Sequence, residues 1–406
     1  MQDQQKKGEN MNETNELGMQ IIDGIPVFGD PVDQGALEQI KNAQGYYASK
    51  VALMADHHLG FGVPIGGVVA YPEHVSPSGV GFDIACGNKA VLTDAKPIKT
   101  KTQIHRIMDD VFKKISFGVG RVNEEEVEHE LFDDPLWNEL PVLKANKDKA
   151  VAQLGTVGSG NHYVDVFIDE QDRVWVGVHF GSRGLGHAIA TEYIDVAKSK
   201  GYFQDGISVL HHQSDAGEEY IKAMDLAGRY AYAGRDWVCA KVAKIIGGDI
   251  LDEVHNHHNF AWRETHGDED LWVVRKGATP AFPGQRGFVG GSMGENAVII
   301  EGMGGDLAEH TLHSTVHGAG RVMSRTRAKG NAKKGIQGEI SERAMQKWLS
   351  EAGVVLRGGG VDEAPQAYKR LTDVLGYHGD SIRVVHTLKP IGVAMAPSGT
   401  KDPYKD

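Results

Sequence analysis

Two residue types suited to metal binding stand three positions apart in the stretch Gly79-Val-Gly-Phe-Asp-Ile-Ala-Cys-Gly87. The carboxylate of Asp83 and the thiol of Cys86 can converge on one ion if the chain between them turns tightly, and the flanking glycines permit such a turn. The spacing alone is also compatible with a purely structural role. Whether this spacing indicates a metal site therefore depends on the histidines elsewhere in the chain.

Histidines in polar or glycine-rich surroundings are candidates to complete such a site. They occur as His162 after the turn Gly158-Ser-Gly-Asn161, as His179 after the apolar run 174–178, and within His255-Asn-His-His-Asn259. One carboxylate, one thiolate and three imidazoles suit one or two divalent ions, with the thiolate able to bridge, and ligand softness by itself favours zinc. A hydrogen-bonding turn histidine at position 162 and a strand-end histidine at position 179 are the alternatives.

A further histidine, His317, precedes a Gly-Ala-Gly turn in the segment from Ser314 to Arg325. Such a turn can present backbone N–H groups to an anion. Imidazole has an intrinsic pKa of about 6.5, so the neutral base is plentiful at neutral pH, and it is a competent nucleophile toward phosphorus. The alternatives are a capping histidine or a fourth imidazole ligand for a metal.

Basic residues follow His317 with no acidic residue among them: Arg321, Arg325, Arg327, Lys329, Lys333 and Lys334. A solvated basic face is the ordinary interpretation of such a run. Its position directly after His317 favours contacts with phosphate groups. The overall charge of −12, from 43 basic and 55 acidic residues, does not favour non-specific binding to nucleic acid, so any such contact depends on a local patch.

Composition bounds the remaining possibilities. The 406 residues are 40% hydrophobic, as in an ordinary protein with a buried core, and two cysteines are too few for a disulfide framework. The N-terminus is polar without the apolar region of a signal peptide, and no apolar run reaches transmembrane length. The sequence therefore predicts a cytoplasmic protein without a membrane partner. We expect residues 1–18 to be a disordered tail and residues 19–406 to form one domain.

The elements that must position these residues alternate between strand and helix. We expect strands at 21–28, 50–54, 66–71, 174–178, 272–275, 297–301 and 383–388, and helices at 33–43, 103–115, 187–198, 214–246 and 340–352. Residues 121–150 are charged and are expected to form a surface excursion. The class is α/β, with mixed sheets flanked by helices. Because the candidate ligands come from five separate segments, we expect one interwoven domain around a central metal cleft.

These motifs, in this order, resemble the RtcB family of GTP-dependent RNA ligases. The similarity runs from about residue 50 to residue 395. The motifs that carry it are the Asp83–Cys86 segment, Gly160-Asn-His162, His179-Phe-Gly-Ser-Arg-Gly-Leu-Gly186, His257-His-Asn259, Gly290-Gly-Ser-Met-Gly294 and His317-Gly-Ala-Gly-Arg-Val-Met-Ser-Arg325.

The resemblance implies a site with two Mn²⁺ ions and GTP. The implied metal ligands are Asp83, Cys86, His162, His179 and His258. Cys86 would bridge the ions, Asp83 and His258 would hold one of them, and the other two histidines would hold the second. His258 precedes the asparagine of its motif and is preferred to His257 for that reason.

The resemblance also implies the reaction. His317 would attack the α-phosphorus of GTP and carry GMP, which passes to an RNA 3′-phosphate after any 2′,3′-cyclic phosphate has been opened. A 5′-hydroxyl then displaces GMP and joins the strands, in tRNA splicing or RNA repair. An accessory activator is an expected partner besides RNA and GTP. The implied nucleotide contacts are Asn161, Asp165, Ser292, His317, Ala319 and Gly320, and the implied RNA contacts are Arg183, Arg321 and Arg325.

Three positions depart from the family pattern. Asp165 stands where the family carries Glu, Ala297 where it carries Ser, and Met395 where it carries a Lys that contacts guanine. All three are expected around the base. Three alternatives to a GTP-dependent ligase stay open. They are a paralogue with another nucleotide preference, a metal-dependent phosphoesterase that acts on RNA ends without a nucleotide, and a non-catalytic protein that binds RNA ends.

Overall fold

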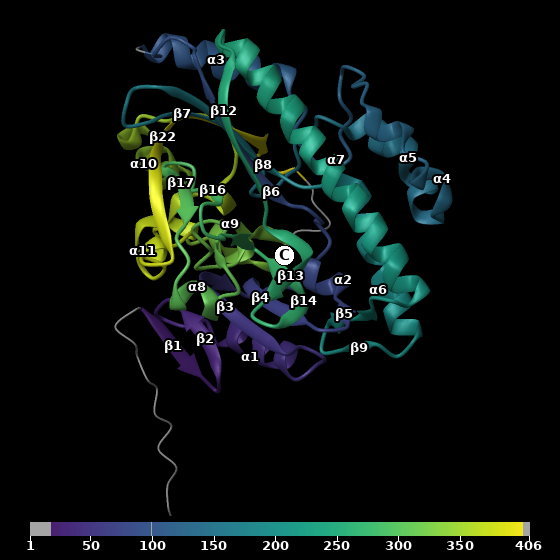
Figure 1. Ribbon diagram of the computed structural model, residues 1–406. Helices are drawn as coiled ribbons and strands as arrows, with labels where there is room; N and C mark the ends of the chain where they lie inside the picture. Colours follow the sequence, from purple (N-terminus) through teal and green to yellow (C-terminus); the bar gives the residue numbers. More distant parts are fainter. Residues whose placement is uncertain (1–17, 99, 401–406) are drawn as a thin grey trace, which may run out of the picture.

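A computed structural model describes residues 18–98 and 100–400 of the chain. The expected tail at residues 1–18 lies outside the described residues except for Gly18. The described part is a mixed α/β fold, as the sequence predicts, and two large sheets form its framework (Figure 1).

The first sheet has six strands. Their order is β1 (Met19–Ile22), β2 (Ile25–Phe28), β3 (Lys50–His58), β4 (Ile65–Tyr71), β14 (Glu269–Lys276) and β13 (Asn259–His266). The single strand expected at residues 21–28 is a hairpin, because Asp23 and Gly24 adopt positive φ angles of 49° and 80° and reverse the chain. Pairing in this sheet is antiparallel except between β2 and β3.

The second sheet has eight strands. Seven lie in the order β12 (Ile250–His257), β6 (Gly87–Thr93), β8 (Val174–Phe180), β7 (Tyr163–Ile168), β22 (Ile382–Pro397), β17 (Ala297–Gly302) and β16 (Arg286–Val289), and β21 (Val355–Gly359) pairs with β22. Strands β6, β7 and β8 are buried along almost their whole length. Continuous burial requires cover on both faces, which explains their unbroken apolar runs.

Helices supply this cover. The longest, α7 (Asp215–Ile246), begins after Ser214, whose hydroxyl accepts a hydrogen bond from the backbone N–H of Gly217, and it packs against β6 and β8. α3 (Lys101–Lys114) packs against β21 and β22, and α1 (Gln34–Gln44) packs against β3. Figure 1 shows α7 along one flank, with α4 (Leu136–Glu139), α5 (Pro141–Gln153) and α6 (Arg183–Ser199) beyond it.

Short elements connect these layers. The paired strands are β5 (His74–Val75) with β11 (Leu210–His211), β9 (Phe203–Gln204) with β10 (Ile207–Ser208), β15 (Ala278–Pro280) with β18 (Ser314–Val316), and β19 (Gly330–Asn331) with β20 (Ile336–Gln337). The short helices are α2 (Pro77–Val80), α8 (Asp306–His310), α9 (Arg325–Lys329), α10 (Glu342–Ala352), α11 (Leu371–Gly376), η1 (Glu130–Asp133), η2 (Ala332–Lys334), η3 (Val361–Glu363) and η4 (Pro365–Ala367).

Several expected boundaries differ from the structure. The region 121–150 is more than a surface excursion, because η1, α4 and α5 bury Trp137 and Leu143 against the core while their charges face outward. β3 continues to His58, four residues beyond its expected end. α6 already begins at Arg183, four residues before its expected start at 187. Charged and glycine-containing stretches weakened the local signals at each of these places.

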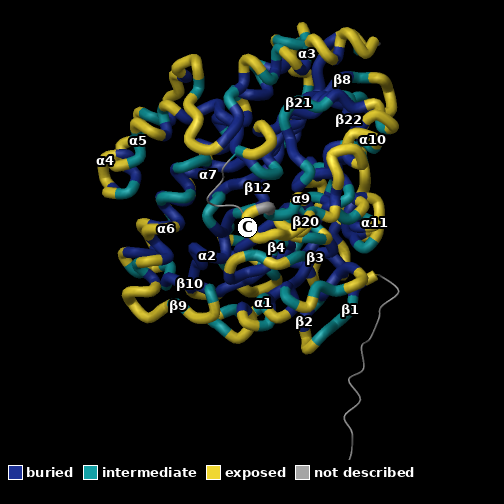
Figure 2. The backbone as a smooth tube through the Cα atoms, turned by 180° about the vertical axis from the view of Figure 1, so that it is seen from behind, coloured by how far each residue is buried: buried dark blue, intermediate teal, exposed yellow. Residues whose placement is uncertain are grey.

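Figure 2 shows the buried strands inside the molecule and the exposed stretches mainly on the outer helices and loops. One hydrophobic cluster joins the first sheet to helices α1, α5, α6 and α7, and a second fills the space between the strands of the second sheet, α3 and α7. No helix among the described residues combines the length and apolar character needed to cross a bilayer.

Candidate metal and nucleotide site

The loop between α2 and β6 brings Asp83 and Cys86 together. Ala85 adopts a left-handed φ of 58°, and the N–H of Cys86 bonds to the carbonyl oxygen of Asp83 at 3.0 Å. The turn is therefore as tight as the spacing requires. Gly87 follows it, and a Cβ there would lie 2.2 Å from the carbonyl oxygen of Asn256. Glycine thus allows β12 to approach the cysteine.

Three histidines reach the same loop from neighbouring strands. His179 lies near the end of β8, where it pairs with Tyr163 of β7, and His162 immediately precedes β7. His258 lies between β12 and β13, and its N–H bonds to the carbonyl oxygen of Cys86 at 2.8 Å. The neighbouring His257 contacts Arg235 instead, so the structure brings His258 and not His257 to the cluster.

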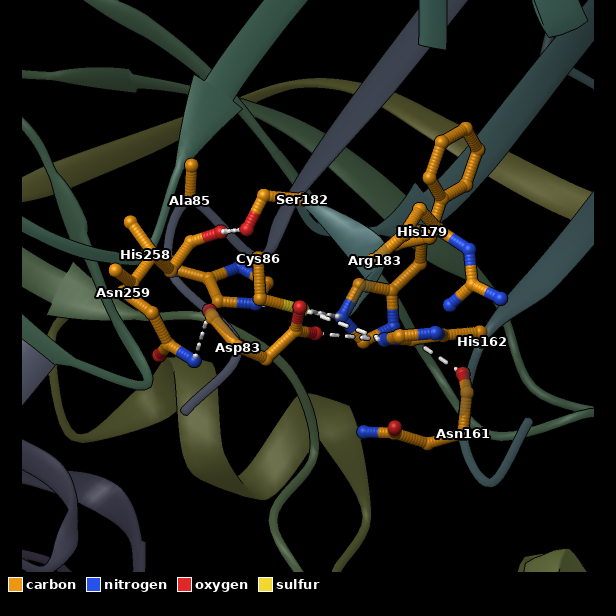
Figure 3. A network of polar contacts seen from close by, with 12 residues as sticks. Asp83, Ala85, Cys86, Asn161, His162, His179, Ser182, Arg183, His258 and Asn259 are labelled. Atoms are coloured by element: carbon orange, nitrogen blue, oxygen red, sulfur yellow. Dashed lines mark hydrogen bonds and ion pairs between the residues drawn. The ribbon is translucent and has the colours of Figure 1, made fainter. Parts of the chain in front are cut away.

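The five side chains converge closely (Figure 3). Cys86 Sγ lies 3.2 Å from His179 Nε2 and 3.6 Å from His162 Nε2. His162 Nε2 lies 3.0 Å from Asp83 Oδ2, and His179 Nε2 lies 3.3 Å from His258 Nε2. The donor atoms form two groups, Asp83–Cys86–His162 and Cys86–His179–His258, with the thiol common to both. This grouping differs from the expected ligand pairing but keeps Cys86 at the centre.

The donor set fits a divalent cation. His179 Nδ1 lies 3.2 Å from the carbonyl oxygen of Asn161, which fixes its proton there and leaves the Nε2 lone pair facing the thiol. Burial, and then neighbouring histidines, lower the pKa of His179 and His258 well below the usual value, so both rings are neutral. Converging neutral imidazoles, a thiol and a carboxylate are the ligand types of a zinc or transition-metal site.

Arg235 of α7 holds the backbone behind this cluster. Its guanidinium is fully buried and donates to the carbonyl oxygens of Ala85 and Phe180 at 3.0 and 2.6 Å. It also bonds to the ring nitrogens of His255 and His257 at 2.8 and 2.9 Å. Three of these partners directly neighbour a candidate ligand in the chain: Ala85 precedes Cys86, Phe180 follows His179, and His257 precedes His258. One side chain therefore fixes the three segments that supply one group of donors.

His317 lies beside these five candidate metal ligands, which are called the metal-binding cluster below. It follows β18, and its ring centroid lies 4.8 Å from that of His258. Its Nδ1 lies 2.7 Å from Oδ2 of Asp56, and the same oxygen accepts the backbone N–H groups of His317 and Gly318 at 2.9 and 3.3 Å. The carboxylate fixes a proton on Nδ1, so Nε2 keeps its lone pair.

Asp56 is fully buried at the end of β3. Burial alone would raise its pKa, but the hydrogen bonds from His317 and the positive charge of Lys369 outweigh this effect and lower it. The carboxyl group therefore stays ionised. Gly320 packs on this residue with a φ of 75°, and a Cβ there would lie 2.2 Å from the carbonyl oxygen of Asp56.

One cavity of about 1310 Å³ contains this arrangement. It is lined by most of the predicted site residues: Asp83, Cys86, Asn161, Asp165, His179, His258, Ser292, His317, Ala319, Gly320, Arg321 and Arg325. His162 reaches the cluster through Asp83 and Cys86. Arg183 is not among the lining residues; it bonds to the hydroxyl of Thr156 and the carbonyl oxygen of Gly118.

Of the three departures from the family pattern, Asp165 and Met395 line the cavity, but Ala297 does not. Ala297 is buried in the apolar core beside Leu388. Asp165 Oδ1 and the hydroxyl of Tyr163 are buried without a hydrogen-bond partner. Burial raises the pKa of Asp165 well above its usual value.

The basic run after His317 meets acids from other segments. Arg321 and Arg325 both pair with Glu363 of η3, and Arg321 also donates to the carbonyl oxygen of Asp362 at 2.8 Å. Lys329 Nζ lies 3.1 Å from Asp362 Oδ2. The local basic patch expected from the sequence is therefore partly neutralised. Arg321 and Arg325 still line the cavity, but their side chains are already held by carboxylates.

Sequence reasoning missed two residues of this site. Asp56 stands in a strand and Arg235 in a helix. The available signal for Asp56 was an aspartate directly after the apolar run 51–55, because a buried carboxylate needs a partner. Arg235 lies in a helix with several other charges and had no comparable signal.

The chain belongs to the RtcB family of tRNA-splicing ligases, whose model matches residues 37–140 and 137–396. The RNA-splicing ligase RtcB of Escherichia coli (strain K12) is 30% identical over 406 aligned residues, which cover 89% of this chain and 94% of that protein. The tRNA-splicing ligase RtcB of Archaeoglobus fulgidus is 30% identical, covering 89% of this chain and 91% of its own. An RtcB homologue from Entamoeba dispar is 28% identical over 79% of this chain.

Proposed function

We propose that this protein is an RNA ligase that joins a 3′-phosphate or 2′,3′-cyclic phosphate end to a 5′-hydroxyl end, with His317 carrying GMP. One observation carries the proposal: His317 lies beside a cluster of five metal-binding side chains, and Asp56 holds its Nδ1 so that Nε2 keeps its lone pair. Family membership supports an RNA substrate.

In the proposed first step, Nε2 of His317 attacks the α-phosphorus of GTP. A nitrogen–phosphorus bond forms, the bond to the β-phosphate oxygen breaks, and pyrophosphate leaves. The proton stays on Nδ1, where the Asp56 carboxylate stabilises the charge that develops on the ring. Where the RNA end is a 2′,3′-cyclic phosphate, water first opens it to a 3′-phosphate. An oxygen of the 3′-phosphate then attacks the phosphorus carried by His317, and the nitrogen–phosphorus bond breaks. Finally the 5′-hydroxyl attacks the RNA 3′-phosphorus and gives its proton to solvent, the bond to GMP breaks, and GMP leaves.

Asp83, Cys86, His162, His179 and His258 would hold two Mn²⁺ ions in this proposal. Bound ions would neutralise phosphate charge and align the attacking and leaving oxygens. The other residues act by position. Arg235 fixes the ligand segments, and Asn161, Ser292, Ala319 and Gly320 would contact the nucleotide from the cavity wall. RNA, GTP and an accessory activator are the proposed partners, and a cytoplasmic location stays a prediction.

Incubation with Mn²⁺ and α-labelled GTP or ATP tests the proposal. We expect label to stay on the wild-type protein through a denaturing gel and to be lost on acid treatment, since phosphoramidates are acid-labile. His317→Ala should take no label, whereas His310→Ala, at an exposed histidine of α8, should label normally. Equal labelling of His317→Ala would contradict the proposal.

The phosphoesterase alternative makes a different prediction in the same samples. It requires RNA-end hydrolysis that persists in His317→Ala and disappears in Cys86→Ala. Labelling by ATP in preference to GTP would instead indicate the paralogue with another nucleotide preference, because Asp165 and Met395 line the same cavity as His317.

A further inference from the structure

A short loop at the cavity wall exposes apolar side chains. This rim loop, defined as residues 59–62 after β3, carries Leu59 and Phe61, which are 57% and 39% exposed and both line the cavity. Neither belongs to the hydrophobic clusters of the described core. Single exposed apolar residues are ordinary, but two in one loop beside a functional cavity indicate a contact surface.

The backbone of the rim loop is held rigidly. Gln39 of α1 brackets Gly60, donating to its carbonyl oxygen at 2.6 Å and accepting from its N–H at 3.0 Å. The buried Lys276 donates to the carbonyl oxygen of Phe61 at 2.6 Å. Gly62, at a φ of 70°, packs so closely on Gly206 that a Cβ would lie 2.4 Å from its carbonyl oxygen. The apolar side chains are thus presented by a fixed support.

Phe61 is the outer member of an aromatic row. Its ring centroid lies 5.5 Å from that of Phe82, which in turn stacks on His187 of α6 at 5.1 Å and 25°. Phe82 packs partly against the main hydrophobic cluster and directly precedes Asp83, one of the metal-binding side chains. The middle ring of the row is therefore anchored in the core and is joined directly through the chain to one of the candidate metal ligands.

We propose that Phe61, backed by Phe82, stacks on the unpaired base at the RNA end whose phosphate reaches the metal-binding cluster. The inference rests on the proposed function. RNA ends are recognised largely by stacking of splayed bases on aromatic side chains, which tolerates any sequence. The surroundings of Phe61 suit this use, because the loop offers apolar surface beside the groups that would handle phosphate.

The guanine base of GTP is better matched by another part of the cavity wall. Asp165 and Tyr163 line the cavity from β7 in the second sheet, and their carboxyl and hydroxyl groups are of the kind that reads the polar edge of a base. The rim loop extends from β3 in the first sheet, and its exposed side chains Leu59 and Phe61 carry no polar atoms for such reading. Stacking without edge recognition suits an RNA that is joined regardless of sequence.

Binding of a fluorescent single-stranded RNA with a 3′-phosphate, measured by anisotropy, tests the proposal. We expect Phe61→Ala and Phe61→Leu to weaken binding about tenfold and Phe61→Tyr to stay within about twofold of wild type, since only a planar ring stacks. Tyr202→Ala is the matched control: this aromatic residue is also 39% exposed but lies outside the cavity. Full affinity of Phe61→Leu would overturn the proposal, because it would show a non-specific apolar contact.

An RNA whose 3′-terminal nucleotide lacks its base provides the second arm. Wild-type protein should bind it about tenfold more weakly than the intact RNA, and Phe61→Ala should not distinguish the two RNAs. If Phe61→Ala instead raised the GTP concentration for half-maximal labelling by a similar factor, the ring would contact guanine and the inference would be wrong. Wild-type labelling without RNA tests the proposed function separately, so the two failures are distinguishable.

Discussion

His317 and Asp56 are 261 positions apart in the sequence, yet Nδ1 of the imidazole lies 2.7 Å from Oδ2 of the carboxylate. The oxygen also accepts two backbone N–H groups of the turn that carries the histidine. These hydrogen bonds therefore fix both the imidazole ring and the backbone turn that carries it. In the proposed reaction, they decide which nitrogen of His317 faces the phosphorus with a lone pair.

Asp56→Asn tests that relationship. An asparagine amide can donate to Nδ1, which would move the ring proton to Nε2 and remove the lone pair that attacks. We expect GMP labelling to fall roughly a hundredfold or more, with circular dichroism unchanged. Asp94→Asn is a control, because that carboxylate also accepts a backbone N–H but lies far from the cavity lining. Normal labelling of Asp56→Asn would refute this role for the carboxylate.

We expect the two cysteines to differ in their contribution to metal binding. Cys86 contributes its sulfur to both groups of donors, whereas Cys239 belongs to α7 and is buried in the hydrophobic core. Cys86→Ala should abolish high-affinity binding of Mn²⁺ or Zn²⁺ in calorimetry, and Cys239→Ala should keep it. Equal metal content in both variants, measured by mass spectrometry, would show that the cluster is not the binding site.

Arg235 should matter for both stability and metal binding. Arg235→Met would leave the carbonyl oxygens of Ala85 and Phe180 buried without donors, at a cost of roughly 1–3 kcal/mol for each group. We expect a lower urea midpoint and weaker metal binding by calorimetry. Arg235→Lys keeps the positive charge but lacks the planar set of N–H donors, so it should recover little of the lost stability or metal affinity. A Lys variant with wild-type metal affinity would argue against the positioning role.

The turn after His317 requires glycine at position 320. Gly320→Ala adds both the strain of a left-handed backbone and a Cβ 2.2 Å from the carbonyl oxygen of Asp56. Gly335→Ala is a matched control, since its φ of 67° is similar but no atom lies within 4 Å of the new Cβ. Strain alone costs about 1–2 kcal/mol, so Gly320→Ala should lose more stability than the control. It alone should lose GMP labelling.

A buried ion pair near β18 should make stability depend on acid pH. Burial alone would raise the pKa of Glu264, but Arg275 and His266 outweigh it and lower the pKa. The group therefore adds stability above its unfolded pKa of about 4.3 and loses it as pH falls through the lower folded pKa. Glu264→Gln should cost about 3 kcal/mol at pH 7, because it leaves the buried Arg275 without its charge partner.

Urea unfolding at pH 7 and at pH 3.5 checks this prediction. The difference between wild type and Glu264→Gln should shrink at the lower pH, where the wild-type carboxylate begins to gain its proton. Arg275 also donates to the hydroxyl of Ser314 and the carbonyl oxygen of Leu312, so the pair supports the strand that leads to His317. A constant difference across this range would mean that the Glu264 charge contributes nothing.

Residue type and local spacing predicted the parts of the site that lie within one segment. The glycine-framed Asp83–Cys86 turn and the helix α7 after Ser214 follow from backbone freedom and capping. The buried strand β8, which ends at His179 and Phe180, follows from its continuous apolar run. These elements depend on interactions between residues that are close in the chain, so they can be predicted without knowledge of the fold.

Only the tertiary structure decided which charged groups meet. The acids at 362 and 363 that neutralise Arg321 and Arg325 lie about 40 positions further along the chain. Asp56 and Arg235 became recognisable only when β3 and α7 had been placed beside His317 and the metal-binding cluster. Electrostatic and hydrogen-bonding partners are set by distance in space. The sequence by itself determined which side chains are candidates for metal ligands and for the nucleophile, and packing between distant segments determined how each of them is held.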